Sequence, residues 1–567
     1  MKNLVLGINL PLLNDGTITY DGNVALCDRE NVIAAIAEER ISKKKYDGNV
    51  SNSVSAVLDR YKLSLNDLEA ISVVSFSQPM EITPGCGEAL RDEINRLFPG
   101  QENIHYVRSH HEAHAISAVC QTTMDNALVV VVDHTGNMLG DKPEADQLEL
   151  NRSEQTSYFK YQAGEINLIA RDHSNAGDQG YGRFYGDVTC YLGFNSYRES
   201  GKTMGLASFG DASALAQFEP FVTAEDGEVI SALREEAYLE DDTKDLKAWF
   251  AKQGLKIPAR RSANDVIRPF DMNLAAWAQD KIEQSICSRV KELLQKHQLD
   301  TVVVVGGVAM NSVLNRALEE RLGVNVYVPP SPGDAGLALG AAAEYFWKQD
   351  KKIPQMASSP YLGFEYSAEE IAAAVAQYED ELKIVKVESP ELEAATAISE
   401  GQTIGWFQGR SEYGPRALGN RSILSSPANS WQKEILNSQI KLREWFRPYA
   451  PVVLEEKANI YFDMLSPVPY MMQVAPVKSQ AKLDMAACIH TDGTARLQTV
   501  NEVANPKFYR LIQELDRLTG TPVVLNTSFN LAGMPIVEDA KDAIECFKLS
   551  VGMDMLIVEN YLIKKNN

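Results

Sequence analysis

The sequence predicts an α/β protein built from two domains, and three observations lead to this prediction. The chain has 567 residues, more than a single hydrophobic core usually holds. Two valine-rich runs, residues 127–133 and 301–305, are typical of strands buried on both faces, and each ends in a glycine-containing turn. Residues 349–360 are polar, with two lysines and two prolines. We expect this segment to be a linker between a domain of residues 1–348 and a domain of residues 361–567.

The overall composition is that of a soluble globular protein, with 45% hydrophobic and 23% charged residues. The net charge of −22 argues against a broad surface for binding nucleic acid. The seven cysteines form no C-x-x-C pair, which predicts a reducing compartment rather than a zinc ribbon or a disulfide framework. The first residues are typical of a strand, and no apolar run approaches the roughly 18 residues of a membrane span. We therefore expect a cytoplasmic protein that binds neither membranes nor nucleic acid.

The first domain begins with a strand, a polar loop and a hairpin, and another buried strand follows. The charged run at residues 38–45 is expected to be a solvated helix or loop. The order of strand, glycine turn and hairpin recurs after residue 127, which predicts an internal duplication. A strongly amphipathic helix is expected at residues 275–294. The expected strands outside the two valine-rich runs are residues 4–9, 24–27, 32–37, 71–76, 148–150 and 157–163.

A histidine motif stands out between these strands. Five of the eight histidines lie between His105 and His134. His110 and His114 are four positions apart, so they project from the same face of a helix, which is the spacing that a metal ion requires. Ser109 followed by Glu112 is typical of a capping box and predicts a helix that begins at His110.

Two carboxylates complete a candidate metal site. Asp133 follows the first valine-rich run, and Asp334 lies in a loop rich in glycine and proline. Two imidazoles with two carboxylates suit a divalent first-row transition metal. The second valine-rich run enters Gly306-Gly307 and then a helix, an arrangement that predicts an anion or nucleotide site.

The second domain concentrates basic residues although the whole chain is acidic. Guanidinium groups bind phosphate in a bidentate manner, so this concentration predicts a phosphate site, with a salt-bridged helix face as the alternative. A polar turn at residues 490–498 and a strand that ends in amide and hydroxyl groups at residues 522–530 are also candidates to line it. The basic residues are Arg410, Arg416, Arg421, Lys441, Arg443 and Arg447.

Taken in order, these motifs resemble those of the O-carbamoyltransferases of the nodulation-factor and antibiotic-tailoring type. The resemblance runs nearly end to end, and the ordered set is far more specific than any single motif. The motifs are His110-His111-x-x-His114-Ala115, Gly201-Lys202-x-Met204-Gly205-Leu206-Ala207, Gly306-Gly307-x-Ala309-x-Asn311, Ser331-Pro332-Gly333-Asp334-x-Gly336, residues 409–422, Arg447-Pro448-Tyr449-Ala450-Pro451, His490-x-Asp492-Gly493-Thr494-x-Arg496-x-Gln498 and Asn526-Thr527-Ser528-Phe529-Asn530.

The resemblance implies a fold and a reaction. The N-terminal domain is expected to be similar to the tRNA threonylcarbamoyl transferase fold, a duplicated actin-like ATPase architecture (Kae1-like), and the C-terminal α/β domain to be YrdC-like. The C-terminal domain would make carbamoyl-adenylate from carbamoyl phosphate and ATP, with Mg²⁺ accompanying the ATP. The N-terminal domain would transfer the carbamoyl group to a hydroxyl of a small molecule beside Fe²⁺ or a similar divalent metal. A homodimer is left open.

The resemblance also assigns residues. The metal ligands are expected to be His110, His114, Asp133 and Asp334. Nucleotide binding in the first domain is expected of Lys202, Gly205, Gly306, Gly307, Asn311 and Asp334. Carbamoyl phosphate and ATP in the second domain are expected to contact Arg416, Lys441, Arg447, His490, Arg496, Asn526, Ser528 and Asn530, with Lys441 and Arg447 taking part in catalysis.

The chain departs from the family pattern in two places. The family has a His-Asp pair in its first loop, where this chain has Tyr20-Asp21. A phenol with an ordinary pKa near ~10 is a poorer base at neutral pH than an imidazole, so Asp21 becomes a second candidate base for the transfer step. His134 stands where the family has glycine, which would narrow the metal site or add a ligand.

Other functions compete with this interpretation. An actin-like small-molecule kinase would leave the His110/His114 pair and the basic second domain unexplained. A tRNA-modifying threonylcarbamoyl enzyme calls for a basic face, and a hydrogenase-maturation carbamoyltransferase calls for C-x-x-C zinc sites. A nucleotide-binding protein that has lost carbamoyl transfer remains open because of Tyr20.

Overall fold

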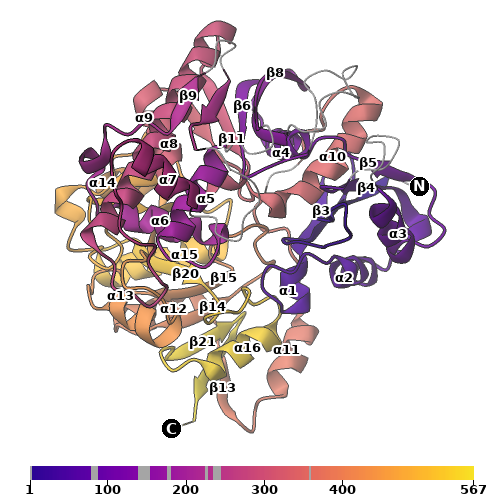
Figure 1. Ribbon diagram of the computed structural model, residues 1–567. Coiled ribbons are helices and arrows are strands. Elements are labelled where there is room, and N and C mark those ends of the chain that lie inside the picture. Colours follow the sequence, from indigo (N-terminus) through magenta and orange to yellow (C-terminus); the bar gives the residue numbers. More distant parts are fainter. Residues whose placement is uncertain are drawn as a thin grey trace. The chain divides into compact units, whose positions relative to one another are not determined.

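The computed structural model describes residues 3–77, 87–137, 153–174, 180–223, 228–233, 244–356 and 359–566. The chain forms two compact units. Unit 1 comprises residues 1–32 and 60–357, and unit 2 comprises residues 33–59 and 358–567. Figure 1 labels their helices and strands. The strand expected at residues 148–150 lies outside the described residues. Within the described ranges, no helix has both the length and the apolar character needed to cross a membrane.

The first sheet has five strands in the order β3-β2-β1-β4-β5. Strand β1 is antiparallel to β2 and parallel to β4, and β4 is parallel to β5. Three expected strands are confirmed almost to the residue, and the strand expected at residues 71–76 is found a few residues earlier. The strands are β1 (Leu4–Asn9), β2 (Asn23–Cys27), β3 (Val32–Ala37), β4 (Leu68–Val74) and β5 (Ile104–Tyr106).

The second sheet repeats this arrangement in the order β12-β11-β6-β7-β8. Strand β6 is antiparallel to the next strand, β7, and parallel to β11, which is parallel to β12. Strand β6 thus corresponds to β1, and the duplication expected from the sequence is confirmed by the matching strand order. The strands are β6 (Asn126–Val132), β7 (Ser153–Gln162), β8 (Glu165–Ser174), β11 (Thr301–Val305) and β12 (Asn325–Tyr327), with a small pair β9 (Phe221–Thr223) and β10 (Val229–Ser231) apart from them.

Helices cover these sheets. The amphipathic helix expected at residues 275–294 lies within α8, and the histidine helix α4 begins at His110 as expected. The helices of this part are α3 (Glu88–Leu97), α4 (His110–Val119), α5 (Tyr181–Tyr191), α6 (Ser200–Ala207), α7 (Lys244–Lys252), α8 (Pro269–His297), α9 (Ser312–Leu322) and α10 (Leu337–Asp350).

Two glycines let helix α10 approach its neighbours closely. A Cβ atom on Gly7 of β1 would lie 1.9 Å from the carbonyl oxygen of Ala338 in α10. A Cβ atom on Gly340 of α10 would lie 2.1 Å from the carbonyl oxygen of Ala113 in α4. Backbone atoms cannot give way to such contacts, so both positions require glycine. This packing fixes the histidine helix against α10.

Unit 2 contains an eight-stranded sheet in the order β13-β22-β21-β14-β15-β20-β16-β19. Strands expected near residues 404, 523 and 555 and the closing helix are confirmed. The strands are β13 (Leu382–Lys386), β14 (Ile404–Phe407), β15 (Arg421–Ser425), β16 (Ala450–Leu454), β19 (Gln498–Val500), β20 (Val523–Ser528), β21 (Met555–Val558) and β22 (Tyr561–Lys565), with β17 (Val474–Pro476) and β18 (Thr494–Arg496) paired separately.

Both faces of this sheet are buried. Consecutive residues Ile423 and Leu424 of β15 belong to different hydrophobic clusters. One cluster includes residues of α11 (Ala368–Ala376) and α16 (Ala540–Leu549), and the other includes residues of α12 (Pro390–Ser399) and α15 (Pro506–Thr519). Because successive side chains of a strand point to opposite faces, the sheet lies between these two pairs of helices. The α/β class is therefore confirmed for both units, and the YrdC-like relationship stays a prediction.

The charged run at residues 38–45 is less solvated than expected. Glu38 and Arg40 lie in the short helix α1 (Glu38–Ser42), and both are buried. The carboxylate of Glu38 accepts hydrogen bonds from the backbone N–H groups of Asn52 and Ser53 in α2 (Ser51–Tyr61). The expectation of a wholly solvated run is therefore wrong, because one of its charges serves as an acceptor for the start of the next helix.

Substituting Gly340→Ala tests the close approach of α10 and α4. Alanine in a helix interior normally stabilises by about 1 kcal/mol relative to glycine. Overpacking a core costs about 1–3 kcal/mol, so we expect a net loss of up to about 2 kcal/mol and a lower Tm by calorimetry. Gly201→Ala in α6 is the control, because its Cβ would meet nothing within 4 Å. Equal Tm values for both variants would contradict the packing argument.

Candidate functional site

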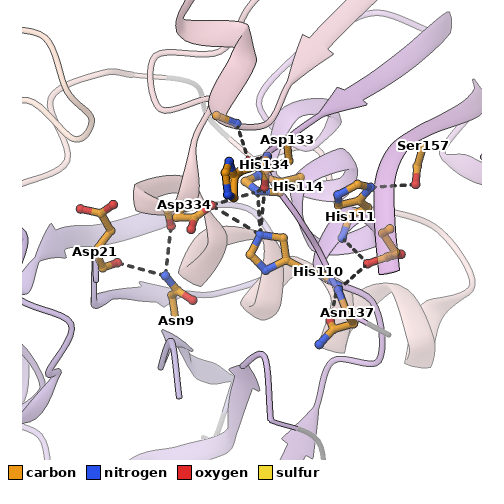
Figure 2. A network of polar contacts seen from close by, with 12 residues as sticks. Asn9, Asp21, His110, His111, His114, Asp133, His134, Asn137, Ser157 and Asp334 are labelled. Atoms are coloured by element: carbon orange, nitrogen blue, oxygen red, sulfur yellow. Dashed lines mark hydrogen bonds and ion pairs between the residues drawn. The ribbon is translucent and has the colours of Figure 1, made fainter. Parts of the chain in front are cut away.

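Four side chains predicted as metal ligands converge in unit 1 (Figure 2). His110 and His114 project from the first turns of α4, and Asp133 follows the last residue of β6. Asp334 opens a short 3-10 helix, η5 (Asp334–Gly336), that leads into α10. One ligand atom from each of the four residues can be chosen so that all lie within 4.8 Å of one another. The structure thus brings together residues that are more than 200 positions apart in the chain.

The distances between these atoms fit a common central ion. The two Nε2 atoms are 3.2 Å apart, and each is 3.2 Å from Oδ2 of Asp133. Oδ1 of Asp334 lies 3.4 Å from Nε2 of His110 and 3.3 Å from Nε2 of His114. Donor atoms about 2.1 Å from one ion at tetrahedral angles are about 3.4 Å apart. The donor set and its spacing therefore fit a first-row transition metal.

The side chains of this cluster stabilise one another's charges, positive on the histidines and negative on the aspartates. Burial disfavours a charged imidazole, but hydrogen bonds and charges from Asp133 and Asp334 outweigh burial and raise the pKa of His110 to about 10. Burial also favours neutral acids, yet the two histidines lower the pKa of Asp334 to about 2 and hold the pKa of Asp133 well below its usual range. The two carboxylates are thus held ionised, which is the state that binds a cation.

The Gly306-Gly307 turn supports one of these carboxylates. Oδ1 of Asp133 accepts hydrogen bonds from the backbone N–H of Gly307 at 3.1 Å and of His134 at 2.8 Å. A Cβ on Gly306, where φ is +97°, would lie 2.4 Å from the carbonyl oxygen of Val132. The two glycines therefore let β11 end beside β6 and orient Asp133. Their expected role in nucleotide binding stays a prediction.

A buried network that the sequence did not reveal holds the start of the histidine helix. The backbone N–H of His110 donates to Oδ1 of Asn137 at 2.8 Å, and Ser109 Oγ accepts from the N–H of Glu112 at 3.0 Å. Ser109 Oγ in turn donates to Glu154 at 2.6 Å. Only the Ser109 half of the expected capping box is seen. The Glu112 carboxylate, which in a full box accepts the backbone N–H of Ser109, instead pairs with Lys348 at 3.6 Å.

Glu154 is the centre of this network. It is fully buried in β7 and forms an ion pair with Arg171 of β8 at 2.8 Å. Its carboxylate also accepts the backbone N–H of Asn137 at 3.1 Å. A carboxylate is favourable at a helix N-terminus, so Glu154 stabilises the turn that carries His110. Nothing in the local sequence around Glu154 marks this role, since its partners come from other elements.

The first loop is attached to the metal cluster through backbone atoms (Figure 2). The carbonyl oxygen of Asp21 accepts hydrogen bonds from the amides of Asn9 at 3.0 Å and Asn23 at 2.6 Å. Both amides also donate to the carbonyl oxygen of Asp334, at 3.3 and 2.9 Å. Asp21 has φ +62°, a conformation that few residues adopt. The backbones of Asp21 and Asp334 are therefore tied together by two shared amides.

The aromatic residues beside the cluster form a separate group. Tyr20 is 44% exposed, and the guanidinium of Arg198 lies over its ring. His134 is not among the four converging ligands, and its ring stacks on that of Tyr197 with 4.4 Å between centroids. His134 is thus engaged in a ring stack with Tyr197 rather than in the group of four ligand atoms.

The other residues of unit 1 that were predicted to bind nucleotide lie in helix α6 or at the start of α9. Lys202 of α6 forms an ion pair with Glu199 at 2.5 Å, and Gly205 lies one turn further along the same helix. Asn311 caps α9 by accepting the N–H of Leu314 at 3.1 Å. These contacts account for the residues structurally, and their nucleotide role stays a prediction.

In unit 2, Lys441 is held by the strand end predicted to line a phosphate site. Its Nζ donates to the Ser528 carbonyl oxygen at 2.5 Å, to Ser528 Oγ at 3.2 Å and to Asn530 Oδ1 at 2.8 Å. Burial lowers the pKa of Lys441 well below its usual range, and the charges of Arg443 and Arg447 act in the same direction. A buried cation next to other cations favours binding of an anion.

Arginines extend this cationic group. Burial, and then the charges of Arg416, Arg443 and Arg447, lowers the pKa of Arg496. The Nε atom of Arg496 is buried without a hydrogen-bond partner among the described residues. Burial and the charge of Arg447 lower the pKa of Arg416 to about 10. Arg416, Lys441, Arg447 and Arg496, the four basic residues predicted to contact phosphate, thus belong to one group of like charges, as expected for a phosphate site.

Two other arginines of the basic concentration have structural contacts. The side chain of Arg421 is fully buried and donates to the carbonyl oxygens of Glu538 and Gln408. Arg410 donates to the carbonyl oxygens of Gly363 and Leu362. The basic residues that are concentrated in the sequence thus form two groups in the fold. Arg416, Lys441, Arg443 and Arg447 form a cationic cluster with Arg496, whereas Arg410 and Arg421 donate hydrogen bonds to backbone carbonyl oxygens.

Two other residues that were predicted to contact the phosphates, His490 and Asn526, have contacts within unit 2. Burial lowers the pKa of His490 to about 4, and the charges of Arg496 and Lys433 act in the same direction. Nδ1 of His490 is 3.0 Å from the Thr494 hydroxyl. Asn526 donates to the carbonyl oxygen of Ala417 at 3.0 Å. His490 is thus neutral beside the arginines, and Asn526 has a structural partner.

Neutralising Glu154 tests its role in positioning the metal ligands. We expect Glu154→Gln to weaken Co²⁺ binding by about 10- to 100-fold, because loss of a residue that supports metal ligands costs that much affinity. Calorimetric or spectroscopic titration with Co²⁺ measures this change. Glu165→Gln, at the exposed turn of the same hairpin, is the control. Unchanged Co²⁺ affinity in Glu154→Gln would show that the helix start needs no support from Glu154.

Comparisons with known proteins show the family to which the chain belongs. The family models for the carbamoyltransferase N-terminus and C-terminus match residues 100–343 and 395–565. The chain is 30% identical to nodulation protein NolNO of Sinorhizobium fredii, over 97% of this chain and 79% of that protein. It is 29% identical to uncharacterized protein sll1178 of Synechocystis sp., over 96% of this chain and 95% of that protein.

The family assignment depends on these sequence relatives. Full-length HypF in its phosphate- and nucleotide-bound form is 13% identical, with a TM-score of 0.37, over 61% of this chain and 47% of that one. Nodulation protein NolO of Bradyrhizobium diazoefficiens is 31% identical, over 81% of this chain and 79% of that protein. The matched models cover the histidine helix, the glycine turn, both aspartates and the cationic cluster. The chain therefore belongs to the carbamoyltransferase family.

Proposed function

We propose that the protein is an ATP-dependent O-carbamoyltransferase with two reaction sites. The C-terminal domain, residues 361–567, makes carbamoyl-adenylate from carbamoyl phosphate and ATP. The N-terminal domain, residues 1–348, transfers the carbamoyl group to a hydroxyl of a small molecule. The observation that carries this proposal is the buried group of like charges around Lys441, which has the chemistry of a phosphate site.

The proposed reaction balances with one water. Water cleaves the mixed anhydride of carbamoyl phosphate into carbamate and inorganic phosphate. A carbamate oxygen then attacks the α-phosphorus of ATP, so carbamoyl-adenylate forms and pyrophosphate leaves. In the last step the acceptor oxygen attacks the carbamoyl carbon, its proton passes to a base, and AMP leaves.

The cationic cluster suits the first two steps. Arginine forks bind phosphate oxygens bidentately, and the leaving phosphate and pyrophosphate both gain negative charge in the transition state. The depressed pKa values of Arg496 and Lys441 report an unfavourable accumulation of positive charge that a phosphate would relieve. Ser528 and Asn530 fix the direction of the Lys441 ammonium.

The metal cluster suits the transfer step. His110, His114, Asp133 and Asp334 would hold Fe²⁺ or a similar divalent metal, since their donor atoms and spacing fit such an ion. When bound, such a metal supplies Lewis-acid polarisation of a carbonyl or phosphoryl oxygen. Burial of the two histidines excludes water from the ligand side, which protects a reactive anhydride from hydrolysis.

The base for transfer is proposed to come from the first loop. Asp21 and Tyr20 lie on the segment whose backbone is tied to Asp334 by Asn9 and Asn23. A carboxylate is ionised at neutral pH, whereas a phenol with an ordinary pKa near ~10 is not. Asp21 is therefore our proposed proton acceptor, and Tyr20 is proposed to contact the acceptor molecule. The net charge of −22 supports a small-molecule acceptor over tRNA.

Adenylate formation predicts that the protein releases pyrophosphate when given carbamoyl phosphate, ATP and Mg²⁺. We expect Lys441→Met to reduce this rate by about 100-fold, the typical cost of removing a donor that stabilises developing charge. Methionine fills a similar volume and avoids a buried charge, and Tm checks that the fold is kept. Lys478→Ala, at a surface ion pair with Asp463, is the control. No pyrophosphate from the wild-type protein would contradict the proposal.

Separation of the two sites predicts a second result. We expect His114→Ala to retain pyrophosphate release and to lose carbamoyl transfer, because His114 belongs to the metal cluster alone. Transfer is measured by mass spectrometry of small-molecule extracts, as a mass gain of one carbamoyl group replacing a proton. His297→Ala, at the end of α8, is the control. Loss of both activities in His114→Ala would refute the division between the sites.

A further inference from the structure

The loop that contains Arg416 is closed by a single buried carboxylate in unit 2. Oε1 of Glu412 accepts hydrogen bonds from three backbone N–H groups, those of Leu418 at 2.7 Å, Asn420 at 2.8 Å and Arg421 at 3.3 Å. Glu412 is 3% exposed, so these bonds form away from bulk water. Because residues 418–421 are bound back to residue 412, the segment between them forms a closed loop, and Arg416 lies in it.

Two glycines make the shape of this loop possible. Gly414 and Gly419 have φ values of +123° and +110°, which residues with a side chain rarely adopt. A Cβ atom on Gly419 would also lie 2.2 Å from Cδ1 of Phe508 in α15. Pro415 follows the first glycine, and its ring fixes its own φ. The backbone on both sides of Arg416 is therefore strongly restricted.

Amide side chains from two strands of the sheet hold the carbonyl groups of the loop. Nδ2 of Asn526 in β20 donates to the carbonyl oxygen of Ala417 at 3.0 Å. Nε2 of Gln498 in β19 donates to the carbonyl oxygen of Leu418 at 3.0 Å. Both amides are buried, and the Tyr361 hydroxyl donates to the same Leu418 oxygen. Side chains from other elements therefore bind the loop backbone and fix the loop to the sheet.

The same two strands connect the loop to other members of the cationic cluster. Ser528, two positions after Asn526, accepts a hydrogen bond from Nζ of Lys441 at 3.2 Å. Residues two apart in a strand lie on the same face, so the side chains that hold the loop and Lys441 are neighbours on β20. Arg496 ends β18, two positions before Gln498. The hydrogen bonds thus fix the loop to the segments that hold Lys441 and carry Arg496.

We propose that Glu412 is a positioning residue for phosphate binding and acts by holding the Arg416 loop in place. The proposal rests on the proposed function, because it requires Arg416 to contact a phosphate of carbamoyl phosphate or ATP. A buried carboxylate is costly, and Oε2 of Glu412 has no hydrogen-bond partner among the described residues. The benefit is a loop whose backbone is fixed before the ligand arrives, so less conformational entropy is lost on binding.

Glu412→Gln tests this role. Glutamine keeps the size of the side chain but replaces a charged acceptor of three N–H groups with a weaker, neutral one. We expect binding of pyrophosphate and of Mg-ATP to weaken about ten-fold, the equivalent of one hydrogen bond to a charged group. Calorimetric titration measures both affinities. In the pyrophosphate-release assay, Glu412→Gln should raise the KM for ATP by more than it lowers kcat.

Glu38→Gln is the matched control. Glu38 is also a buried carboxylate of unit 2 that accepts backbone N–H groups, those of Asn52 and Ser53. We expect its Tm to fall and its affinity for both ligands to match the wild-type protein. If Glu412→Gln does not fold, Gln498→Leu replaces it in every measurement, because it removes a hydrogen bond from the other side of the same loop.

A double-mutant cycle shows whether Glu412 acts through Arg416. Arg416→Met should weaken the binding of both ligands. Glu412→Gln should add no further loss in that background, since the loop then carries no guanidinium to hold in place. A residue that stabilises unit 2 as a whole would instead give losses that add, and additive losses would overturn the positioning role.

The remaining outcomes separate this proposal from the proposed function. Equal ligand affinities in Glu412→Gln and Glu38→Gln would overturn the role of Glu412. If the wild-type protein binds pyrophosphate and Mg-ATP but releases no pyrophosphate from carbamoyl phosphate and ATP, the proposed reaction fails, while the titrations still decide the role of Glu412. If the wild-type protein binds neither ligand, both proposals fail.

Discussion

The attraction between two buried carboxylates and two buried imidazoles is the interaction on which the first unit depends. Asp133 and Asp334 are held ionised only because His110 and His114 face them across 3.2–3.4 Å. Burying such charges is costly unless they are paired, so the elements that carry them must be placed accurately. Gly340 and the network around Glu154 serve this purpose, since both fix the helix that carries the histidines.

The second unit gathers charges of one sign instead of pairing opposite charges. Its cluster gathers Arg416, Lys441, Arg443, Arg447 and Arg496, whose positive charges disfavour one another. The Lys441 ammonium donates hydrogen bonds to Ser528 and Asn530, which offset part of the cost of burying it. The charges of one unit thus favour a cation and those of the other favour an anion, as the proposed reaction with a metal ion and phosphate-bearing substrates requires.

The duplicated strand order explains how distant parts of unit 1 meet. Strands β1 and β6 hold equivalent places in their sheets, and a polar residue at or just after the end of each lies at the candidate metal cluster. Asp133 follows β6 and is a predicted metal ligand, whereas Asn9 ends β1 and donates to the backbone of Asp334. The second half thus supplies a predicted ligand at this point and the first half supplies support. The loop after β1 carries Tyr20 and Asp21, so the residues proposed to serve carbamoyl transfer lie on the supporting side.

The sequence by itself determined the α/β class, the duplication, the start of the histidine helix and the four converging ligands. It could do so because strand and helix periodicities are local and because histidine and aspartate in fixed motifs have few other uses. Only the tertiary structure decided that Arg410 and Arg421 serve backbone carbonyls, that Glu154 holds the histidine helix, and that residues 33–59 belong to unit 2. These roles depend on partners brought from distant elements, and neither charge nor burial of a single residue in a sequence specifies its partner.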